Sequence, residues 1–519
     1  MKNVLEYLEH SAGSFGSKTA VIDDQESCTY EKLLNVSQQA GLSLTSQIEP
    51  GAAVAVMMKK SVCTLQMFFA ITYAGGFYSL IDPGFPADRI QRQLSVLTPR
   101  VVITLPEYAD KLREAGYTGT VLMADALRSA AAADIQETSQ SRSGLKTPSF
   151  SLPKALSEIR NSQDPAAPLY CNFTSGSTGI PKGVLVGHDS VIAFIDAFTD
   201  LFSITDEDVI GNQAPFDFDV SVKDIFSAIK TGATLVIIPT AYFRFPNQVM
   251  DMLCEHKVTT LIWAVSALVL LNRLHMFLYK VPPCINKILF SGEEMPAKHL
   301  ADWKAQYPDA LFVNLYGPTE ITCNCTYHII DKDYAPGEKI PIGTAYPGKQ
   351  ILLLDETDNL ITPDQEDVTG ELCVSGSGLA IGYYHNPEAT DRAFIQYPDA
   401  GGNSVRVYRT GDLAYYHEGL LYFAGRKDFQ IKHNGHRIEL EEIERCINAL
   451  DQVQQACCIY DEEKYRLIAF YTGCEDQKAI IEQLKKKLPE YMIPNRFRYL
   501  EQLPLTKNGK VDRKLLKTM

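Results

Sequence analysis

The sequence predicts an α/β fold, with a large N-terminal domain of layered α/β sheets and a small mobile α+β C-terminal domain. Short apolar runs alternate with amphipathic stretches, as in 52–57 followed by 64–74 and in 259–264 followed by 267–277. This alternation is typical of layered α/β sheets. A chain of 519 residues also exceeds a single hydrophobic core, so two or more domains are expected. We place the boundary between residues 425 and 426.

Residues 1–425 form the predicted N-terminal domain. Between about residues 126 and 167 the composition shifts to Ala, Ser, Gln and Lys with scattered Pro, which indicates a long surface connection. The apolar run 169–173 that follows predicts a strand. A second apolar run, 310–313, predicts another strand, and each of the two leads directly into a polar turn.

Residues 426–519 form the predicted C-terminal domain. A Gly-Arg-Lys-Asp turn at 425–428 separates it from a predicted strand at 420–424. Beyond the turn, apolar periodicity predicts a helix at 440–450, strands at 456–460 and 467–472, and a Lys-rich amphipathic helix at 478–487. These elements suffice for a small domain with a core of its own.

Composition excludes several classes of function. A net charge of −14 argues against a general binder of nucleic acid or of anionic membranes, because such surfaces need clustered Lys and Arg. No basic and apolar leader opens the sequence and no apolar run is long enough to span a bilayer, so a cytoplasmic protein without membrane insertion is expected. Twelve cysteines show no framework spacing, and Cys323-x-Cys325 with His328 does not fit a zinc site.

The loop after 169–173 carries the strongest functional signal. It reads Phe-Thr-Ser-Gly-Ser-Thr-Gly-Ile-Pro-Lys-Gly over 173–183, a flexible cradle of hydroxyls, glycines and one lysine that suits a polyphosphate. Its spacing does not fit a Walker loop. The alternative is a Ser/Gly surface linker. The apolar runs on both sides and the lysine within the loop favour the phosphate site.

Three further turns carry polar side chains suited to a nucleotide. Tyr-Gly-Pro-Thr-Glu at 316–320 follows the strand 310–313, at the sheet edge where open α/β folds bind ligands. It offers an aromatic face, a hydroxyl and a carboxylate. In Arg-Thr-Gly-Asp-Leu at 409–413, Asp412 could accept hydrogen bonds from ribose, and Lys510 follows a Gly turn near the C-terminal end. Taken singly, each is equally well an ordinary turn or a solvated lysine.

A dinucleotide-binding alternative rests on Gly376-x-Gly378-x-x-x-Gly382, which follows a predicted strand at 371–375. The spacing is one residue too long for the dinucleotide fingerprint. We therefore do not predict a nicotinamide cofactor.

Five segments, taken together and in this order, resemble the core motifs of the adenylate-forming superfamily: 173–183, 316–320, 408–413, 425–444 and 503–514. The resemblance extends over nearly the whole chain. Within the superfamily the chain looks most like amino-acid adenylation enzymes, namely the adenylation domains of nonribosomal peptide synthetases and D-alanine:carrier protein ligases. The resemblance implies an ATP- and Mg²⁺-dependent ligase. It would convert an amino acid to aminoacyl-AMP with release of pyrophosphate, then transfer it to the phosphopantetheine thiol of a carrier protein.

The resemblance assigns the nucleotide site residue by residue. It implies that Tyr316 stacks on adenine, Thr319 contacts the α-phosphate, Glu320 holds Mg²⁺, and Asp412 and Arg426 bind ribose. The full ATP-binding set is Thr174, Ser175, Gly176, Ser177, Thr178, Lys182, Asn314, Tyr316, Thr319, Asp412 and Arg426.

The resemblance also implies the catalytic group and the moving parts. Thr319 and Glu320 act with Lys510, which would bridge the substrate carboxylate and the nucleotide so that two anions can approach. Because Lys510 lies on the small domain, catalysis would depend on domain orientation. Asp428 would be the hinge, and Gly435 would face the incoming phosphopantetheine arm.

Asp219 decides the substrate class under this resemblance. In amino-acid-activating relatives an aspartate at this position pairs with the substrate α-ammonium, and a buried carboxylate without a cation is costly. The alternative is an aspartate that caps a helix start. The substrate-binding set is Asp219, Val220, Lys223, Trp263, Leu289, Ser291, Leu315, Cys323 and Asn324.

The pocket residues give mixed indications of the amino acid. Trp263, Leu289 and Leu315 would narrow the pocket towards a compact side chain. Lys223 could pair with an acidic side chain or point outward. Ser291 lies where D-alanine ligases tend to have cysteine, which argues against D-alanine.

The expected partners are an amino acid substrate and a phosphopantetheinylated carrier protein supplied in trans, with no nucleic acid. The sequence ends nine residues after Lys510 with no carrier motif, so we expect a free-standing enzyme. An acyl- or aryl-CoA synthetase of the same superfamily is the alternative enzyme. A non-catalytic nucleotide-binding or scaffold protein is the alternative of a different class.

Overall fold

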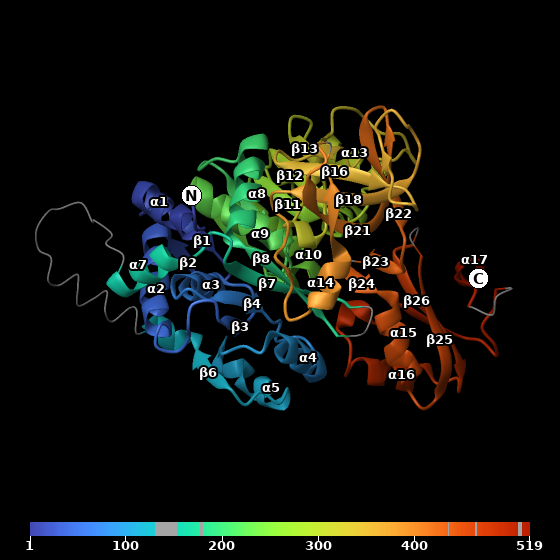
Figure 1. The fold of residues 1–519 in the computed structure, drawn as a ribbon, viewed down its shortest axis with the longest axis horizontal. Helices are drawn as coiled ribbons and strands as arrows, with labels where there is room; N and C mark the ends of the chain where they lie inside the picture. Colours follow the sequence, from blue (N-terminus) through green and yellow to red (C-terminus); the bar gives the residue numbers. More distant parts are fainter. Residues whose placement is uncertain (130–152, 177–179, 400, 434, 462–463, 507–510) are drawn as a thin grey trace, which may run out of the picture.

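The computed structural model describes residues 1–129, 153–176, 180–399, 401–433, 435–461, 464–506 and 511–519. The predicted residues Ser177, Thr178 and Lys510 lie outside these ranges. The fold is α/β, with a large N-terminal part and a smaller C-terminal part, as predicted (Figure 1).

Two α/β sheets form the body of the N-terminal part. The first has seven strands in the order β19-β8-β7-β4-β3-β5-β6. Its strands are β3 (Ala53–Met57), β4 (Phe77–Leu80), β5 (Val101–Thr104), β6 (Thr120–Met123), β7 (Pro168–Thr174), β8 (Lys182–Gly187) and β19 (Gly382–Tyr383). The predicted strand at 169–173 is therefore β7, which lies beside β4 and pairs antiparallel with β8.

The second sheet has nine strands in the order β15-β14-β13-β12-β11-β9-β10-β1-β2. These are β1 (Thr19–Ile22), β2 (Ser27–Thr29), β9 (Val209–Asn212), β10 (Thr234–Ile237), β11 (Thr260–Ala264), β12 (Lys287–Ser291), β13 (Leu311–Tyr316), β14 (Thr326–Ile329) and β15 (Thr344–Ala345). Strands β9 to β13 are mutually parallel, so their carboxyl ends lie at one edge. That edge carries the polar turn after β13, where a ligand is expected.

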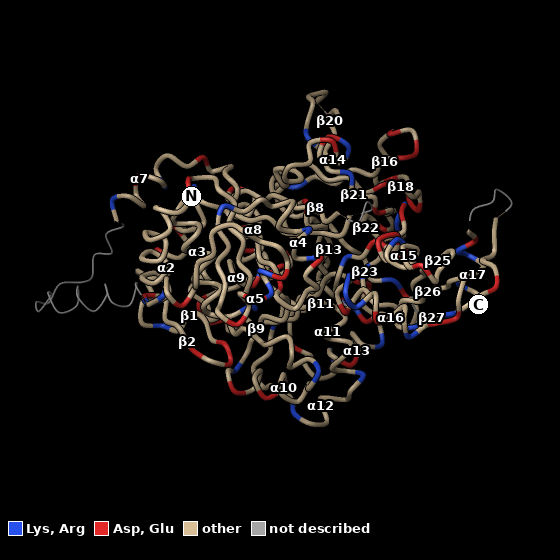
Figure 2. Tube along the Cα trace, turned by 90° about the horizontal axis from the view of Figure 1, so that it is seen from below, with Lys and Arg blue, Asp and Glu red and all other residues tan. Residues whose placement is uncertain are grey.

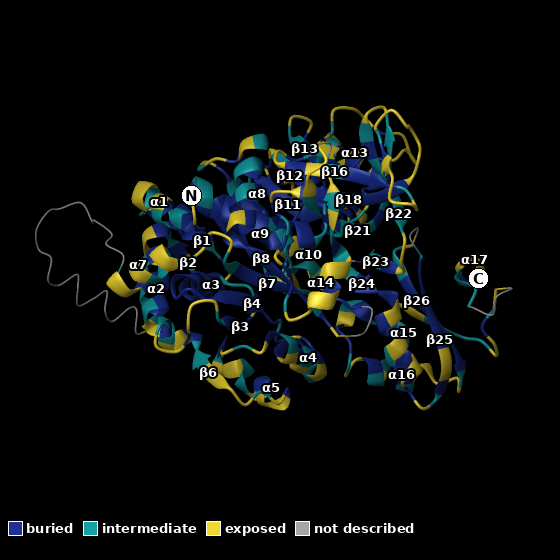
Figure 3. Ribbon diagram, in the orientation of Figure 1, coloured by how far each residue is buried: buried dark blue, intermediate teal, exposed yellow. Residues whose placement is uncertain are grey.

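Helices between the two sheets join them into one core. All twelve residues of helix α3 (Val62–Tyr73) are buried, and most of them are apolar (Figure 3). A helix that is apolar all round is stable only inside a protein. Helices α1 (Leu5–Phe15), α2 (Tyr30–Leu44), α8 (His188–Leu201) and α9 (Val220–Thr231) contribute to the same cluster as side chains of both sheets.

The other helices of the N-terminal part cover its outer faces and connections. They are α4 (Ala87–Leu97), α5 (Ala109–Glu114), α7 (Lys154–Ser162), α10 (Pro246–Glu255), α11 (Val265–Arg273), α12 (Met276–Tyr279), α13 (Ala297–Gln306) and α14 (Pro387–Ala393), with short 3₁₀ turns η1 (Pro106–Tyr108), η2 (Thr240–Arg244) and η3 (Thr319–Ile321). No helix in the described part of the chain is long and apolar enough to cross a membrane.

A third sheet of six strands, all paired antiparallel, closes the N-terminal part. Its strands are β16 (Lys349–Leu354), β17 (Leu360–Ile361), β18 (Gly370–Gly376), β20 (Phe394–Pro398), β21 (Ser404–His417) and β22 (Leu420–Arg426). Strand β22 pairs with β21, which sets Asp412 opposite Arg426. The boundary that we placed after residue 425 therefore falls at the last residue of a strand.

The C-terminal part has its own core, as predicted. A hairpin of β23 (Gln430–His433) and β24 (His436–Glu439) leads to a sheet of β25 (Val453–Asp461), β26 (Arg466–Gly473) and β27 (Arg496–Tyr499). Helices α15 (Leu440–Asn448), α16 (Gln477–Leu484) and α17 (Arg513–Thr518) and the turn η4 (Glu490–Met492) accompany it. Buried side chains of α15, α16 and β25 form one apolar cluster.

Candidate active site

A cleft lies between the strand ends of the N-terminal part and the hairpin β23–β24. The hairpin carries basic residues (Figure 2), and two of them, Lys432 and Arg437, line the cleft. The lining residues shared with the predicted sites are Thr174, Ser175, Asp219, Val220, Ser291, Thr319, Cys323, Asn324, Asp412, Arg426 and Gly435. Segments more than 200 residues apart in the sequence thus meet here, and residues predicted for the nucleotide and for the amino acid line one continuous space.

The described part of the phosphate loop lies at the end of β7. Thr174 pairs with Lys182 in the ladder between β7 and β8. The hydroxyl of Ser175 donates to the carbonyl of Arg437 at 2.9 Å. A Cβ at Gly176 would lie 2.1 Å from the carbonyl oxygen of Ile180, so only glycine fits there. The glycine that we predicted for phosphate binding therefore also has a steric role.

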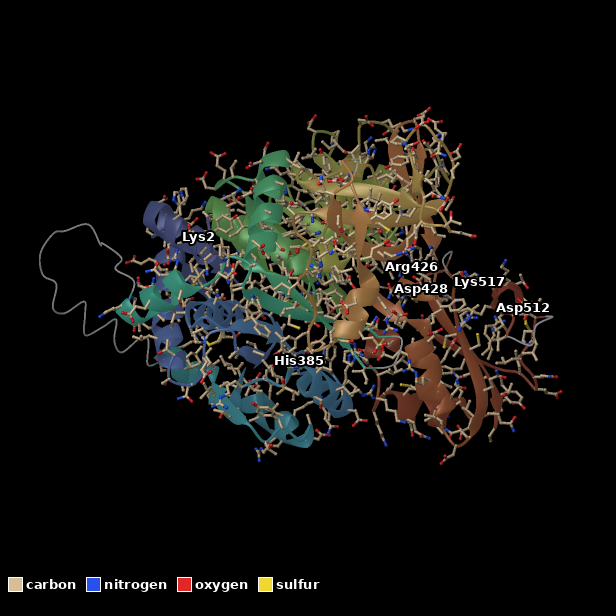
Figure 4. All side chains as sticks on the ribbon, in the orientation of Figure 1. Lys2, His385, Arg426, Asp428, Asp512 and Lys517 are labelled. Atoms are coloured by element: carbon tan, nitrogen blue, oxygen red, sulfur yellow. The ribbon has the colours of Figure 1, made fainter. Side chains whose placement is uncertain are left out.

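Tyr316, Asp412 and Arg426 form one hydrogen-bonded group. The Tyr316 hydroxyl donates to one carboxylate oxygen of Asp412, and the Arg426 guanidinium donates to the other. Arg426 also binds Asp428 through two hydrogen bonds of 2.6 and 2.8 Å. The three residues predicted to hold adenosine are thus together, and the predicted hinge residue is tied to them (Figure 4).

Glu320 is 1% exposed and has two partners. Arg437 Nη1 lies 2.8 and 3.1 Å from its two carboxylate oxygens, and the Tyr383 hydroxyl donates at 2.8 Å. Burial alone would raise the pKa of Glu320, but Arg437 and Tyr383 outweigh it and hold that pKa below its ordinary value. The predicted Mg²⁺ ligand is therefore a carboxylate, paired here with a cation of the hairpin.

Asp219 stands directly before helix α9 but does not cap it. Its side chain accepts no hydrogen bond from the first turn of the helix, which removes the capping alternative. Burial raises the pKa of Asp219, and Lys223 and Thr319 only partly oppose this. Among the described residues, no lysine or arginine forms an ion pair with this carboxylate. A half-buried carboxylate without a cation is suited to a cationic ligand.

The other predicted pocket residues divide between the two faces of the second sheet. Leu289 and Leu315 belong to the core cluster on the side of α9. Trp263 instead belongs to the cluster on the opposite face, where its ring lies edge-on to Phe243 at 5.6 Å and its Nε1 donates to the carbonyl of Gly211 at 2.7 Å. Because side chains of a strand alternate between faces, Trp263 points away from the pocket and does not narrow it.

Asn314 is also absent from the lining of the cleft. Its amide nitrogen donates to the carbonyl of Pro341 at 2.8 Å, and its side chain is 7% exposed. It therefore braces the end of β13 and does not line the cleft.

Three basic residues of the cleft lining were missed by sequence reasoning. Arg437 and Lys432 reach it from the hairpin, and Arg89 reaches it from α4 and pairs with Glu442 of α15 at 3.3 Å. Arg437 and Lys432 lie within the segment 425–444, which carried part of the resemblance. Arg89 is one of several charges on an amphipathic helix, so no pattern in the sequence marks it.

Gly435 lies inside the cleft in this arrangement. Its backbone N–H donates to Glu293 Oε1 at 3.1 Å, and a Cβ on it would lie 3.2 Å from Ala264 Cβ. Its φ of +78° also favours glycine. Of the described residues near position 510, Leu505 and Val511 form a β-bridge, and Asp512 lies apart from Arg426 and Asp428 (Figure 4). The domains are thus oriented with Gly435 at the site.

Comparison with known protein families shows to which family the chain belongs. The sequence matches the family described as AMP-binding enzyme over residues 8–384, and the AMP-binding enzyme C-terminal domain over residues 442–510. The chain belongs to the AMP-binding enzyme family. The predicted superfamily is confirmed, and the chain is an AMP-forming ligase by family.

Curated relatives cover the whole chain. It is 31% identical to D-alanine--D-alanyl carrier protein ligase of Bacillus licheniformis, over 99% of both chains. It is 31% identical to Zwittermicin A synthase ZmaJ of Bacillus cereus, over 96% of this chain and 91% of that protein. It is 34% identical to Bacitracin synthase 1 of Bacillus licheniformis, but spans only 9% of that protein's length.

Solved structures share the fold. The adenylation domain AlmE of Vibrio cholerae, in complex with glycyl-adenosine-5'-phosphate, superposes with a TM-score of 0.84 at 22% identity, over 100% of this chain and 97% of that one. Holo-PA1221, a protein containing adenylation and carrier domains, superposes with a TM-score of 0.78 at 25% identity, over 99% of this chain and 84% of that one.

Proposed function

We propose that the protein activates an amino acid with ATP, releases pyrophosphate, and transfers the aminoacyl group to the phosphopantetheine thiol of a separate carrier protein. Asp219 carries the proposal. It is a half-buried carboxylate that lines the cleft, with no ion pair among the described residues. An α-ammonium group supplies the missing cation, whereas a fatty or aryl acid leaves the carboxylate without one.

The nucleotide end supplies the electrophile. Negative charge builds up at the α-phosphate during adenylation, so cations and hydrogen-bond donors are needed there. Thr174, Ser175, Lys182 and Thr319 would bind the phosphates together with the loop residues Ser177 and Thr178, and Tyr316, Asp412 and Arg426 would bind adenosine. Glu320 would hold Mg²⁺, since a carboxylate is the ligand type that this ion prefers.

Glu320 and Arg437 connect the two half-reactions. While Arg437 is bound to Glu320, as here, the carboxylate already has a cation and hairpin β23–β24 occupies the cleft. We infer that this is the orientation for transfer, with Gly435 beside the acceptor thiol. Adenylation would use a second orientation, reached by rotation at Asp428, in which Lys510 enters the cleft and Glu320 is free for Mg²⁺.

The relatives support a carrier protein as the acceptor. D-alanine--D-alanyl carrier protein ligase is similar over its full length, and Holo-PA1221 carries a carrier domain beside its adenylation domain. A cytoplasmic location is part of this proposal.

Two assays on the full chain test it. ATP/pyrophosphate exchange over both enantiomers of the standard amino acids should show dependence on one of them. The activated amino acid should then load a phosphopantetheinylated carrier protein, with free CoA as the competing acceptor. Exchange that depends on a fatty or aryl acid, or transfer to CoA alone, would assign the chain to the acyl-CoA synthetases. Absence of any exchange would favour a non-catalytic protein.

Lys510→Ala probes the second orientation. Adenylate formation should be largely abolished, while transfer from a pre-formed adenylate should change far less, because Lys510 can reach the cleft in only one orientation. Equal losses in both half-reactions would contradict the proposed rotation.

A further inference from the structure

A second charged side chain lies at the amino-acid end of the cleft. Lys223 is on α9 one helical turn after Asp219, and its side chain is fully buried, with 0% exposed. Its Nζ donates to Asn324 Oδ1 at 2.8 Å and points to Ser291 Oγ at 3.4 Å. Within the described residues no carboxylate forms an ion pair with it. A buried lysine without an anion is rare in proteins.

The hydrogen bonds of Lys223 fix which polar atoms of Ser291 and Asn324 remain available to a ligand. Ser291 and Asn324 both line the cleft. Because the Ser291 oxygen and the Asn324 carbonyl oxygen face the ammonium, the serine O–H and the asparagine NH₂ remain as donors. This end of the pocket therefore offers hydrogen-bond donors beside a positive charge. A ligand group that only accepts hydrogen bonds and carries negative charge is its complement.

The neighbouring carboxylates do not neutralise Lys223 fully. Asp224 accepts from Asn212 Nδ2 at 2.6 Å, and its second oxygen has no hydrogen-bond partner. Burial raises the pKa of Asp224 to about 7, so near neutral pH it carries only part of a charge. Asp219, in the proposed reaction, is engaged by the α-ammonium of the substrate.

A second lysine increases the positive charge of this region. Lys60 is held by Asn212 Oδ1 at 3.0 Å and by backbone carbonyls, including that of Gln213 at 2.8 Å. It acts on Asp224 as Lys223 does. Burial lowers the pKa of Lys60 to about 7, so near neutral pH Lys60 and Asp224 each carry only part of a charge. With the α-ammonium of the substrate on Asp219, Lys223 still has no ion pair with a described carboxylate, and an anionic group of the ligand would supply one.

We propose that the substrate is an amino acid with a carboxylate side chain, of the aspartate or glutamate class, and that Lys223, Ser291 and Asn324 bind that side-chain carboxylate. This inference rests on the proposed amino-acid activation. The carboxylate of Asp219, directly before α9, then binds the α-ammonium of the substrate. The ammonium of Lys223, one turn further along, binds the side-chain carboxylate of the substrate. The α-carboxylate stays free to react with ATP.

The unmodified full chain gives the first test. ATP/pyrophosphate exchange is measured with aspartate, glutamate, asparagine, glutamine, leucine and methionine, in both enantiomers. We expect kcat/KM for one acid to exceed kcat/KM for its amide by about 10-fold. It should exceed kcat/KM for the apolar amino acid of similar size by about 100-fold or more, because the apolar side chain leaves the charge of Lys223 unpaired. Preference for an apolar residue, or equal use of acid and amide, would overturn the inference. Absence of exchange with every amino acid would instead refute the proposed function.

Lys223→Met keeps the length of the side chain and removes its charge. We expect kcat/KM for the acid to fall about 100-fold and the preference for acid over amide to drop below about 3-fold, while the apolar residue improves. Lys230→Met is the matched control on the same helix. Lys230 pairs with Asp196 outside the cleft, so this change should alter exchange less than 2-fold.

Ser291→Ala keeps the lysine, so it still tests the inference if Lys223→Met fails to fold. Thermal unfolding of Lys223→Met would reveal such a defect. Ser291→Ala should reduce kcat/KM for the acid several-fold and leave the apolar residues unchanged, since one donor to the carboxylate is lost. A uniform loss over all substrates in both variants, with preferences unchanged, would assign Lys223 a purely structural role.

Discussion

The two ends of the cleft differ in whether their charged side chains have partners within the protein. At the nucleotide end, Asp412 has Tyr316 and Arg426, and Glu320 has Arg437, so each carboxylate is neutralised by the protein itself. At the amino-acid end, Asp219 and Lys223 have no ion pair among the described residues. Side chains that are paired with each other keep their positions without a ligand. A charged side chain without a partner gains one only when a ligand of opposite charge binds. Under the proposed function, the first end would bind ATP and the second would select the amino acid.

The sharpest way to break this contrast is Asp219→Ala. If Asp219 binds the α-ammonium, the change leaves that cation unpartnered at a cost of about 3 to 5 kcal/mol, a loss of some hundreds-fold in kcat/KM. ATP binding should be unaffected, because the nucleotide end keeps its own pairs. Exchange kinetics with the amino acid and its des-amino analogue, on both proteins, form a double-mutant cycle.

The analogue should be poor with the parent protein and relatively better with Asp219→Ala. Glu207→Ala, an exposed carboxylate before β9, is the control for loss of one negative charge and should change nothing. Additive effects in the cycle would mean that Asp219 does not touch the amine.

Arg437→Gln tests the nucleotide end. It removes the cation from Glu320, and because that carboxylate is buried, the docked hairpin should be weakened and the transfer half-reaction slowed by about 10-fold or more. Adenylate formation should change less, since Glu320 would then have Mg²⁺. Single-turnover loading of a carrier protein and pyrophosphate exchange measure the two steps separately.

The matched control for Arg437→Gln is Arg244→Gln. Arg244 pairs with Glu490 at 2.6 Å and also joins the two parts of the chain, but both side chains are exposed, at 72% and 84%. An exposed pair contributes little, so transfer should change less than 2-fold. Equal effects of the two changes would show that burial of the Glu320–Arg437 pair does not increase its contribution to the transfer half-reaction.

A smaller effect is expected from pH, through His436. Its ring stacks on Tyr491 at 3.6 Å and lies edge-on to Phe218 of the N-terminal part at 4.6 Å. Burial, together with nearby His433 and Arg89, lowers the pKa of His436 to about 3. Between about pH 6.5 and pH 3 the undocked or unfolded form binds a proton that the docked form does not, so stability falls as pH falls through this window.

We expect a loss of about 2 kcal/mol from this group between pH 7 and pH 5. Thermal unfolding of the parent and of His436→Phe at both values measures it, and the variant should lose less stability on acidification. An identical pH response of the two proteins would exclude His436 as the titrating group.

Sequence reasoning found residues that line the cleft where several polar residues are neighbours in the chain. The loop 173–183, the turn 316–320 and the turn 409–413 each hold several polar groups within a few residues, so their spacing carries information. It failed for Trp263 because the strand 260–264 is apolar on both faces, and nothing in an all-buried strand says which face meets the pocket. A shift of one residue in alignment exchanges the faces.

The sequence by itself determined the α/β class, the two-part organisation, the family, and the polar residues of the turns, because local pattern and spacing encode these. Only the tertiary structure decided which charges meet. Glu320 and Arg437 are 117 positions apart, Asp412 and Tyr316 are 96 apart, and Lys223 and Asn324 are 101 apart. Whether a buried charge is paired or awaits a ligand depends on such long-range contacts, since the cost of burial is set by the atoms around it and not by its neighbours in the chain.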